Sequence, residues 1–185
     1  MRLNSFLPAI LLALAPALTA APAAKTYSSA AAYTIYTTYT IVRHAEKATE
    51  AGADGVFDAK DPPLSALGQT HAAVLATALR DVPLYAVYAT PFKRTQSTAQ
   101  PSASQHGLQV KTYAPDLPVA AFVAQLSATA KPGTVLVVAH SNTVPQIVAA
   151  LCHCQAPSLS DADYGDRFDV RIDKNGKATL TRLRY

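Results

Sequence analysis

Arginine and histidine stand side by side at positions 43 and 44, directly after the apolar and β-branched residues 40–42. A guanidinium group stays charged and forks onto oxyanions, and an imidazole can act as a nucleophile. The pattern predicts a buried strand that delivers both side chains to its C-terminal end, where ligands bind in open α/β sheets. By itself, the segment from Thr40 to Lys47 is equally compatible with a solvated strand end that carries ordinary surface charges.

A second cation follows another predicted strand. Residues 85–89 are β-prone, and the spacing predicts a helix from Pro91 to about Gln105 with Thr90 as its cap. Arg94 then lies in the first turn of this helix, where a cation opposes the helix dipole. That placement is easier to explain if an anion binds between the side chain and the free backbone amides.

A third strand end carries a histidine. The continuous apolar run 135–139 predicts a strand that is buried on both faces, followed by His140 and a helix to about Leu151. Alternating strands and helices predict an α/β fold, a three-layer α/β/α sandwich with a mostly parallel central sheet. Because the C-terminal ends of parallel strands share one edge, we expect an electropositive phosphate pocket containing Arg43, His44, Arg94 and His140.

A further helix is predicted over residues 66–80, with Ser65 as its N-cap. The side chains expected on its buried face are Leu67, His71, Val74, Leu75 and Ala78. We therefore interpret His71 as a satisfied or rim histidine rather than a catalytic one. Near the end of the chain, alternating runs on either side of Asn175-Gly176 predict a β-hairpin.

The first 24 residues have the pattern of a secretory signal peptide: Arg2, an apolar stretch from Phe6 to Leu18, and small residues beyond it. We expect a single domain over residues 25–185 in an exported protein, periplasmic or secreted. The apolar stretch is too short and too interrupted by proline for a stable membrane anchor. The formal charge of +4, or +3 once Arg2 is removed, does not indicate nucleic-acid binding.

The only cysteines, Cys152 and Cys154, flank His153. An oxidising compartment favours a disulfide, but a pair this close would close a very tight ring. A lone Cys-His-Cys also lacks the second pair of ligands of a metal site. The order of preference is unpaired thiols first, a local disulfide second and metal binding third.

Four motifs resemble those of the histidine phosphatase superfamily, also known as the phosphoglycerate-mutase-like family. The family's Arg-His-Gly/Ala-Glu signature matches residues 43–46, and its Leu-Ser/Thr-x-x-Gly segment matches residues 64–68. Its Tyr-x-Ser/Thr-Pro-x-x-Arg-x-x-x-Thr segment matches residues 88–98, and its strand-His-x-Asn segment matches residues 137–142. The motifs also occur in the required strand-to-helix context.

This resemblance implies roles for the pocket residues. His44 is the expected nucleophile, which forms a phosphohistidine that water then hydrolyses. Arg43, Arg94 and His140 are expected to hold the phosphoryl oxygens and stabilise the transition state, and Asn142 to bind substrate. The resemblance implies no metal and no cofactor.

The proton donor to the leaving group is left open by the sequence. One branch of the family carries Asp directly after the second histidine, where Ser141 stands in this chain. Another branch carries Glu on an inserted loop. The candidates here are Asp116, Asp61, Asp58 and Asp54, and for each alone a solvated loop charge is the better interpretation.

The leading functional hypothesis is an exported phosphatase that hydrolyses a small phosphomonoester. Within enzymes, the alternatives are a phosphoryl-transfer mutase, which a chain this short disfavours, and a phosphohistidine-protein phosphatase, which export disfavours. A different class is a non-catalytic protein that binds a phosphorylated ligand on the same fold. Formation of phosphohistidine on His44 would distinguish the enzymes from the binding protein.

Overall fold

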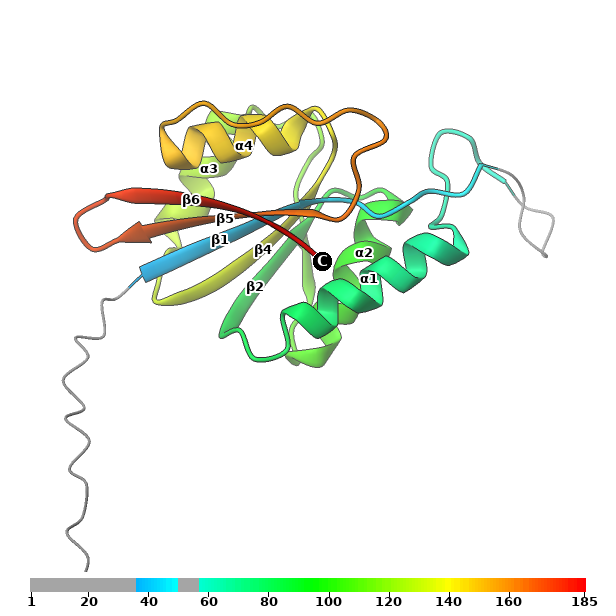
Figure 1. Ribbon diagram of the computed structural model, residues 1–185, viewed down its shortest axis with the longest axis horizontal. Helices are drawn as coiled ribbons and strands as arrows, with labels where there is room; N and C mark the ends of the chain where they lie inside the picture. Colours follow the sequence, from blue (N-terminus) through cyan, green and yellow to red (C-terminus); the bar gives the residue numbers. More distant parts are fainter. Residues whose placement is uncertain (1–35, 50–56) are drawn as a thin grey trace, which may run out of the picture. The chain divides into compact units, whose positions relative to one another are not determined.

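Six strands and four helices are present in the computed structural model over the residues that it describes, 36–49 and 57–185. The strands are β1 (Tyr36–Arg43), β2 (Leu84–Ala89), β3 (Val110–Thr112), β4 (Gly133–Ala139), β5 (Asp166–Asp173) and β6 (Ala178–Arg184), and the helices are α1 (Ala66–Ala78), α2 (Lys93–Gln105), α3 (Val119–Ala128) and α4 (Thr143–Cys152). The strands form one sheet in the order β3-β2-β4-β1-β5-β6 (Figure 1). The predicted signal peptide lies outside the described residues.

The sheet is mixed, so the prediction of a mostly parallel sheet is only partly confirmed. β3, β2, β4 and β1 pair in parallel, whereas β5 pairs antiparallel with β1 and with β6. After α4, the segment 153–165 returns the chain to the edge where β1 ends, and β5 therefore runs back beside it (Figure 1). The predicted hairpin at Asn175-Gly176 is confirmed, and Gly176 supplies the positive φ of +80° that its turn requires.

Helices cover both faces of the sheet, which confirms the layered α/β arrangement for the described residues (Figure 1). The central strand β4 shows how the two cores are separated. Val135 and Val137 pack in the cluster that contains residues of α3 and α4, while Leu136 and Val138 pack in the cluster that contains residues of α1 and α2. Successive side chains of a strand point to opposite faces, so a strand covered on both faces is a continuous apolar run.

Helix α1 is capped as predicted but buries a different stripe. The Ser65 hydroxyl accepts a hydrogen bond from the backbone nitrogen of Gly68 at 3.1 Å. Leu67 and Val74, predicted to be buried, are 55% and 40% exposed, and the buried residues are Gly68, Ala72, Leu75 and Ala76. A Cβ atom on Gly68 would lie only 2.1 Å from the carbonyl oxygen of Glu46. Small residues face inward because the helix lies directly against that backbone.

Helix α2 begins later than predicted. It starts at Lys93, and Phe92, at the N-cap position, makes no side-chain capping hydrogen bond of its own. Thr90 does not cap the helix, because its hydroxyl pairs with the hydroxyl of Thr95 at 2.8 Å and with Nε2 of His140 at 3.0 Å. Arg94 still lies in the first turn, as predicted.

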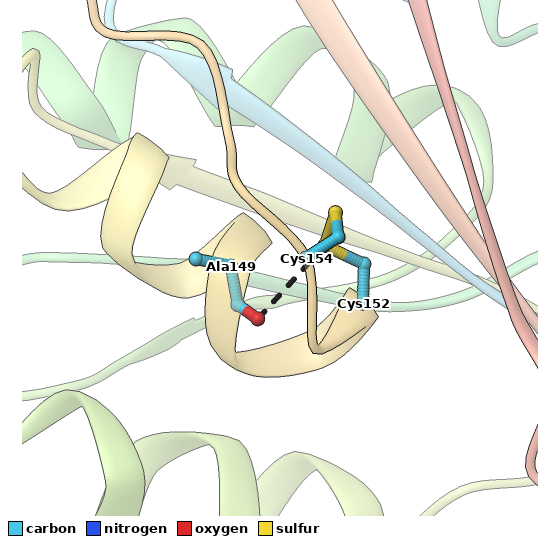
Figure 2. Close-up of a disulfide and its surroundings, with 3 residues drawn as sticks. All are labelled: Ala149, Cys152 and Cys154. Atoms are coloured by element: carbon cyan, nitrogen blue, oxygen red, sulfur yellow. Dashed lines mark hydrogen bonds between the residues drawn. A yellow bond between two sulfur atoms is a disulfide. The ribbon is translucent and has the colours of Figure 1, made fainter.

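The cysteines form a disulfide, so the preference for unpaired thiols was wrong (Figure 2). Cys152 is the last residue of α4, and His153 adopts the left-handed conformation at its C-cap with φ 52° and ψ 39°. This reversal of the chain brings the Cα atoms of Cys152 and Cys154 to 5.2 Å, a spacing at which disulfides form. The Sγ atom of Cys152 also lies 3.8 Å from the carbonyl oxygen of Ala149.

Among the described residues, no helix is long and apolar enough to cross a membrane.

Candidate active site

The C-terminal ends of β1 and β4 bring two histidines to the same edge of the sheet. The strands pair in parallel with Arg43 opposite Ala139, so the residues that follow, His44 and His140, leave the sheet at the same level. A backbone hydrogen bond from His44 to the carbonyl of Ala139, at 2.9 Å, continues this pairing beyond β1. The two imidazole rings lie edge to face, with centroids 5.4 Å apart.

A cleft of about 340 Å³ opens at this edge. All five side chains predicted to bind or attack the phosphoryl group line it: Arg43, His44, Arg94, His140 and Asn142. Asn142 is the N-cap residue of α4 but makes no side-chain capping hydrogen bond. The strand-to-helix alternation therefore brings together residues that are separated by almost one hundred positions in the chain.

The environment of His44 keeps its imidazole neutral. The ring is buried, and Nδ1 lies 2.7 Å from the carbonyl oxygen of Ala45, which can only accept a hydrogen bond. Nδ1 therefore carries the proton, and Nε2 carries the free lone pair. Burial lowers the pKa of His44 from 6.5 to about 3, and the neighbouring His140, Arg43 and Arg94 also lower it. A neutral imidazole is the form that can act as a nucleophile.

His140 lies in a similar environment. Its Nε2 is 3.0 Å from the hydroxyl of Thr90, and its ring packs edge-on against Phe92 at 5.5 Å between centroids. Burial, together with the positive charges of Arg94 and Arg43, lowers the pKa of His140 from 6.5 to about 4. The ring is therefore a neutral hydrogen-bonding group beside His44.

Arg43 is fixed by the segment that follows α4. Its Nη1 donates hydrogen bonds to the carbonyl oxygens of Ser160 at 3.0 Å and Asp163 at 3.1 Å, and its Nη2 donates to the hydroxyl of Tyr164 at 3.2 Å. The Tyr164 ring also lies under the guanidinium, 4.0 Å from Cζ. These contacts hold the guanidinium in one orientation at the cleft.

Arg94 is placed by its helix and by an aromatic ring. Its Cζ lies 4.3 Å from the centroid of Phe92, and its Nη1 lies 3.7 Å from Oδ1 of Asp61. Within the described residues, Nη1 of Arg94 and Nε of Arg43 are buried without a hydrogen-bond partner. A buried charged donor without a partner is costly, and an oxyanion in the cleft would supply the missing acceptors.

None of the described aspartates that the sequence offered as proton donors lines the cleft. Asp61 accepts a hydrogen bond from the backbone nitrogen of Lys93 at 2.8 Å, so it caps the first turn of α2. Asp58 is exposed and accepts from the backbone nitrogen of Lys60, and Asp116 is exposed on a loop. Asp54 lies outside the described residues.

Glu46, the last residue of the first motif, and His71 also lie away from the cleft. Glu46 pairs with His71, with Oε2 and Nδ1 2.8 Å apart, which agrees with the interpretation of His71 as a satisfied histidine. The carbonyl oxygen of Glu46 accepts a hydrogen bond from the backbone nitrogen of Ser65 at 2.9 Å. The Glu46 segment, two residues after His44, is thus joined to the start of α1.

Sequence reasoning missed Asp161, which lines the cleft, and Thr90 and Tyr164, which hold cleft residues. Thr90 follows β2 directly, so its place at the shared strand edge was a usable signal. Asp161 and Tyr164 belong to an irregular segment with no motif, and only the path of the chain shows that it returns to the cleft.

Among the described residues, no group of three or more His, Cys, Asp or Glu side chains is arranged to hold a metal ion.

Part of the chain is similar in sequence to known proteins. Residues 39–115 match the model of the histidine phosphatase superfamily, branch 1. A stretch of 54 residues is 50% identical to the uncharacterized protein Rv0525 of Mycobacterium tuberculosis, and it covers 29% of this chain and 26% of that protein. The chain therefore matches about a quarter of the length of this curated relative.

Solved structures share the fold. The protein histidine phosphatase SixA, complexed with tungstate, aligns with a TM-score of 0.60 at 22% identity over 80% of this chain and 96% of that chain. A mycobacterial glucosyl-3-phosphoglycerate phosphatase aligns with a TM-score of 0.57 at 16% identity over 81% of this chain and 98% of that chain. The fold and the site define an α/β protein with a histidine and arginine cleft. Over residues 39–115 the chain resembles branch 1 of the histidine phosphatase superfamily.

Proposed function

We propose that this protein is a phosphatase that hydrolyses a small phosphomonoester through a phosphohistidine on His44. The observation that carries the proposal is the neutral imidazole of His44, whose Nδ1 is held by the carbonyl of Ala45 and whose Nε2 is free to attack. Two guanidinium groups with unpartnered donors line the same cleft. A nucleophile beside oxyanion donors is the arrangement that phosphoryl transfer requires.

The proposed reaction has two steps. In the first, Nε2 of His44 attacks phosphorus, an N–P bond forms, and the bond to the ester oxygen breaks, with its electron pair leaving on that oxygen. In the second, water attacks phosphorus, and the N–P bond breaks, so the electron pair returns to Nε2. Arg43, Arg94 and His140 hold the phosphoryl oxygens in both steps, and charge developed in the transition state is stabilised by these donors. Because these side chains supply both the nucleophile and the positive charge, we propose a metal-independent reaction.

The structural neighbours support a hydrolytic activity but do not identify the substrate. One is a protein histidine phosphatase and the other a glucosyl-3-phosphoglycerate phosphatase, so phosphatases with different substrates have this fold. The cleft here is polar and open at one edge of the sheet, which suits a small phosphorylated molecule. We also propose that the protein is exported, which rests on the signal-peptide pattern of residues 1–24.

The test is hydrolysis of 4-nitrophenyl phosphate and of a panel of phosphomonoesters by the purified protein and by His44→Ala. We expect the wild-type protein to acquire an acid-labile, base-stable phosphate label and the variant to lose both label and turnover. His153→Asn is the matched control, because His153 is exposed and asparagine tolerates its left-handed backbone. Phosphate binding without label or turnover would identify a binding protein, and unchanged turnover in His44→Ala would exclude the proposed nucleophile.

A further inference from the structure

The cleft contains a carboxylate that the sequence motifs do not identify. Among the described residues that line the cleft, Asp161 is the only acidic one. It belongs to the segment between α4 and β5, and its side chain is 95% exposed. His44, in contrast, is 5% exposed at the inner side of the same cleft. The nucleophile and the carboxylate thus occupy the inner and the outer parts of one cavity.

Two cleft residues hold the Asp161 carboxylate. The hydroxyl of Ser141 donates a hydrogen bond to Oδ1 at 3.1 Å, and Nη2 of Arg43 lies 3.5 Å from the same oxygen. Ser141 directly follows His140, and Arg43 directly precedes His44. The carboxylate is therefore tied to the neighbours of both histidines.

The backbone around Asp161 is also ordered by its own contacts. The backbone nitrogen of Ser160 donates to Oδ2 of Asp163 at 2.6 Å, and the backbone nitrogen of Ala162 donates to the hydroxyl of Ser160 at 3.3 Å. The carbonyl oxygens of Ser160 and Asp163 accept hydrogen bonds from Arg43. The turn that carries Asp161 is therefore hydrogen-bonded to Arg43 both before and after Asp161.

We propose that Asp161 is the proton donor to the leaving oxygen, an inference that rests on the function proposed above. A phosphoryl group that reaches His44 directs its ester oxygen away from Nε2, because attacking and leaving atoms lie roughly in line. That direction is outward, toward the exposed carboxyl group. The proton of the Asp161 carboxylic acid passes to the ester oxygen as the P–O bond breaks, so the product leaves as an alcohol. In the second step the attacking water gives its proton to the Asp161 carboxylate, which restores the acid.

The charged groups around Asp161 change their contacts when a phosphate ester binds. Arg43 is the cation nearest to the carboxylate, and the other charged or titratable groups that line the cleft are His44, Lys47, Arg94 and His140. A bound phosphate ester brings negative charge to Arg43 and competes for its attraction to the carboxylate. Arg43 then holds the phosphoryl group instead of the Asp161 carboxylate, which becomes available to the ester oxygen.

The first experiment compares leaving groups with Asp161→Asn. Asparagine keeps an oxygen that accepts from Ser141 but has no acidic proton. For an alkyl phosphate such as glycerol 2-phosphate, whose leaving oxygen needs a proton, kcat/KM should fall by about 10²–10⁴-fold. For 2,4-dinitrophenyl phosphate, whose leaving group departs as an anion, the fall should stay below about tenfold. Equal losses for both substrates would show a structural role and overturn the assignment.

Asp116→Asn is the matched control, since Asp116 is an exposed aspartate next to Pro115, a residue of the cleft wall. We expect it to leave both substrates unaffected. If Asp116→Asn shows the selective loss with the alkyl phosphate instead, the donor is Asp116 and the proposal fails. If the wild-type protein hydrolyses neither substrate, the proposed function fails and the assignment of Asp161 fails with it.

The dependence of the rate on pH supplies a second readout. With the alkyl phosphate, kcat/KM of the wild-type protein should decline toward alkaline pH as the donor is lost, and Asp161→Asn should remove that decline. Asp161→Glu should restore part of the activity together with the decline. Ser141 is a positioning residue in this scheme, and Ser141→Ala should lower kcat for the alkyl phosphate without changing the shape of the pH profile. A decline that persists in Asp161→Asn would overturn the proposal.

Discussion

Nδ1 of His44 lies 2.7 Å from the carbonyl oxygen of Ala45. A carbonyl accepts hydrogen bonds only, so this contact fixes the proton on Nδ1 and leaves the lone pair on Nε2. The contact is made to the next residue in the chain, and the geometry of the Arg-His-Ala-Glu turn is therefore sufficient to set the tautomer. Burial then keeps the ring uncharged.

The first prediction concerns the protonation of His44. The pKa of His44 is lowered to about 3, so the ring should stay neutral from pH 8 to pH 5. Nitrogen-15 NMR of the histidine rings should show one His44 tautomer with the proton on Nδ1 throughout this range, and His44→Ala identifies the signal. A titration of His44 with a midpoint near its ordinary value would contradict the burial argument.

The same shift should affect stability. In the unfolded chain, His44 and His140 bind protons near pH 6.5, whereas in the folded protein they do so only near pH 3 and pH 4. Between these values the unfolded state binds more protons, so the free energy of unfolding should fall as the pH falls below 6.5. Urea unfolding at pH 7.5 and pH 5 measures the effect, and His140→Gln should reduce the difference between the two pH values. A stability unchanged across this window would show that the folded protein accepts these protons freely.

A second prediction concerns Asp61, which caps α2 and faces Arg94. Asp61→Ala removes the acceptor of the Lys93 backbone nitrogen and should cost about 1 kcal/mol of stability. Asp61→Asn keeps an acceptor but removes the charge, so its stability should stay near that of the wild-type protein. Because Arg94 then has no competing carboxylate, inorganic phosphate should inhibit Asp61→Asn more strongly, by up to about fivefold.

Chemical denaturation and phosphate inhibition together check this prediction. Asp58→Asn is the control, because Asp58 is exposed and its contact is with the backbone nitrogen of Lys60. The control should leave phosphate inhibition unchanged. If Asp61→Asn loses most of its turnover of glycerol 2-phosphate but keeps its turnover of 2,4-dinitrophenyl phosphate, the proton donor is Asp61 and not Asp161.

Most of the regular elements and the five cleft residues Arg43, His44, Arg94, His140 and Asn142 could be predicted from the sequence because they depend on local patterns. The apolar run before His140 and the β-branched run before Arg43 identify buried strands, and parallel pairing then brings their ends together. The prediction fails where position depends on the path of an irregular segment. Asp161 and Tyr164 reach the cleft only because residues 153–165 return to the edge of the sheet.

Other errors have a local cause that the sequence did not reveal. The predicted stripe of α1 followed large apolar side chains, whereas Gly68 and Ala72 face inward because the Glu46 backbone lies against the helix. Thr90 was predicted to cap α2, but its hydroxyl instead contacts His140, which directly follows β4. The disulfide was ranked second because a short ring was expected to be unfavourable, and the left-handed His153 makes it feasible.

A third prediction concerns this disulfide, which joins the end of α4 to the segment that holds Arg43. The chain-entropy estimate for so small a ring gives a stabilisation of about 1–2 kcal/mol. Cys152→Ser/Cys154→Ser should lower the free energy of unfolding by about this amount. It should also weaken inhibition by phosphate, because Ser160 and Asp163 position the Arg43 guanidinium. Reductant should reproduce both effects in the wild-type protein and change neither in the double variant. If reductant changes neither the stability nor the phosphate inhibition of the wild-type protein, and its thiols are shown to be free, the disulfide does not form.

The last prediction concerns Gly68, where two effects oppose each other. In an exposed helix, replacing glycine by alanine stabilises by about 1 kcal/mol. Here the added Cβ would lie 2.1 Å from the carbonyl oxygen of Glu46, and both the carbonyl carbon and the backbone nitrogen of Glu46 would lie 3.0 Å away. These are backbone atoms, so the clash is relieved only by moving α1 or the segment that carries His44. Overpacking of this kind costs about 1–3 kcal/mol, so the steric effect should outweigh the gain in helix propensity.

Gly68→Ala should therefore lower the free energy of unfolding, and its turnover should fall further than the loss of folded protein explains, because Glu46 lies two residues after His44. Gln69→Ala is the matched control on the same helix, since Gln69 is exposed and its replacement should change stability by less than about 0.5 kcal/mol. Urea unfolding and turnover of 4-nitrophenyl phosphate measure the two effects. A Gly68→Ala variant more stable than the wild-type protein would mean that α1 does not lie as close to the Glu46 backbone as its packing indicates.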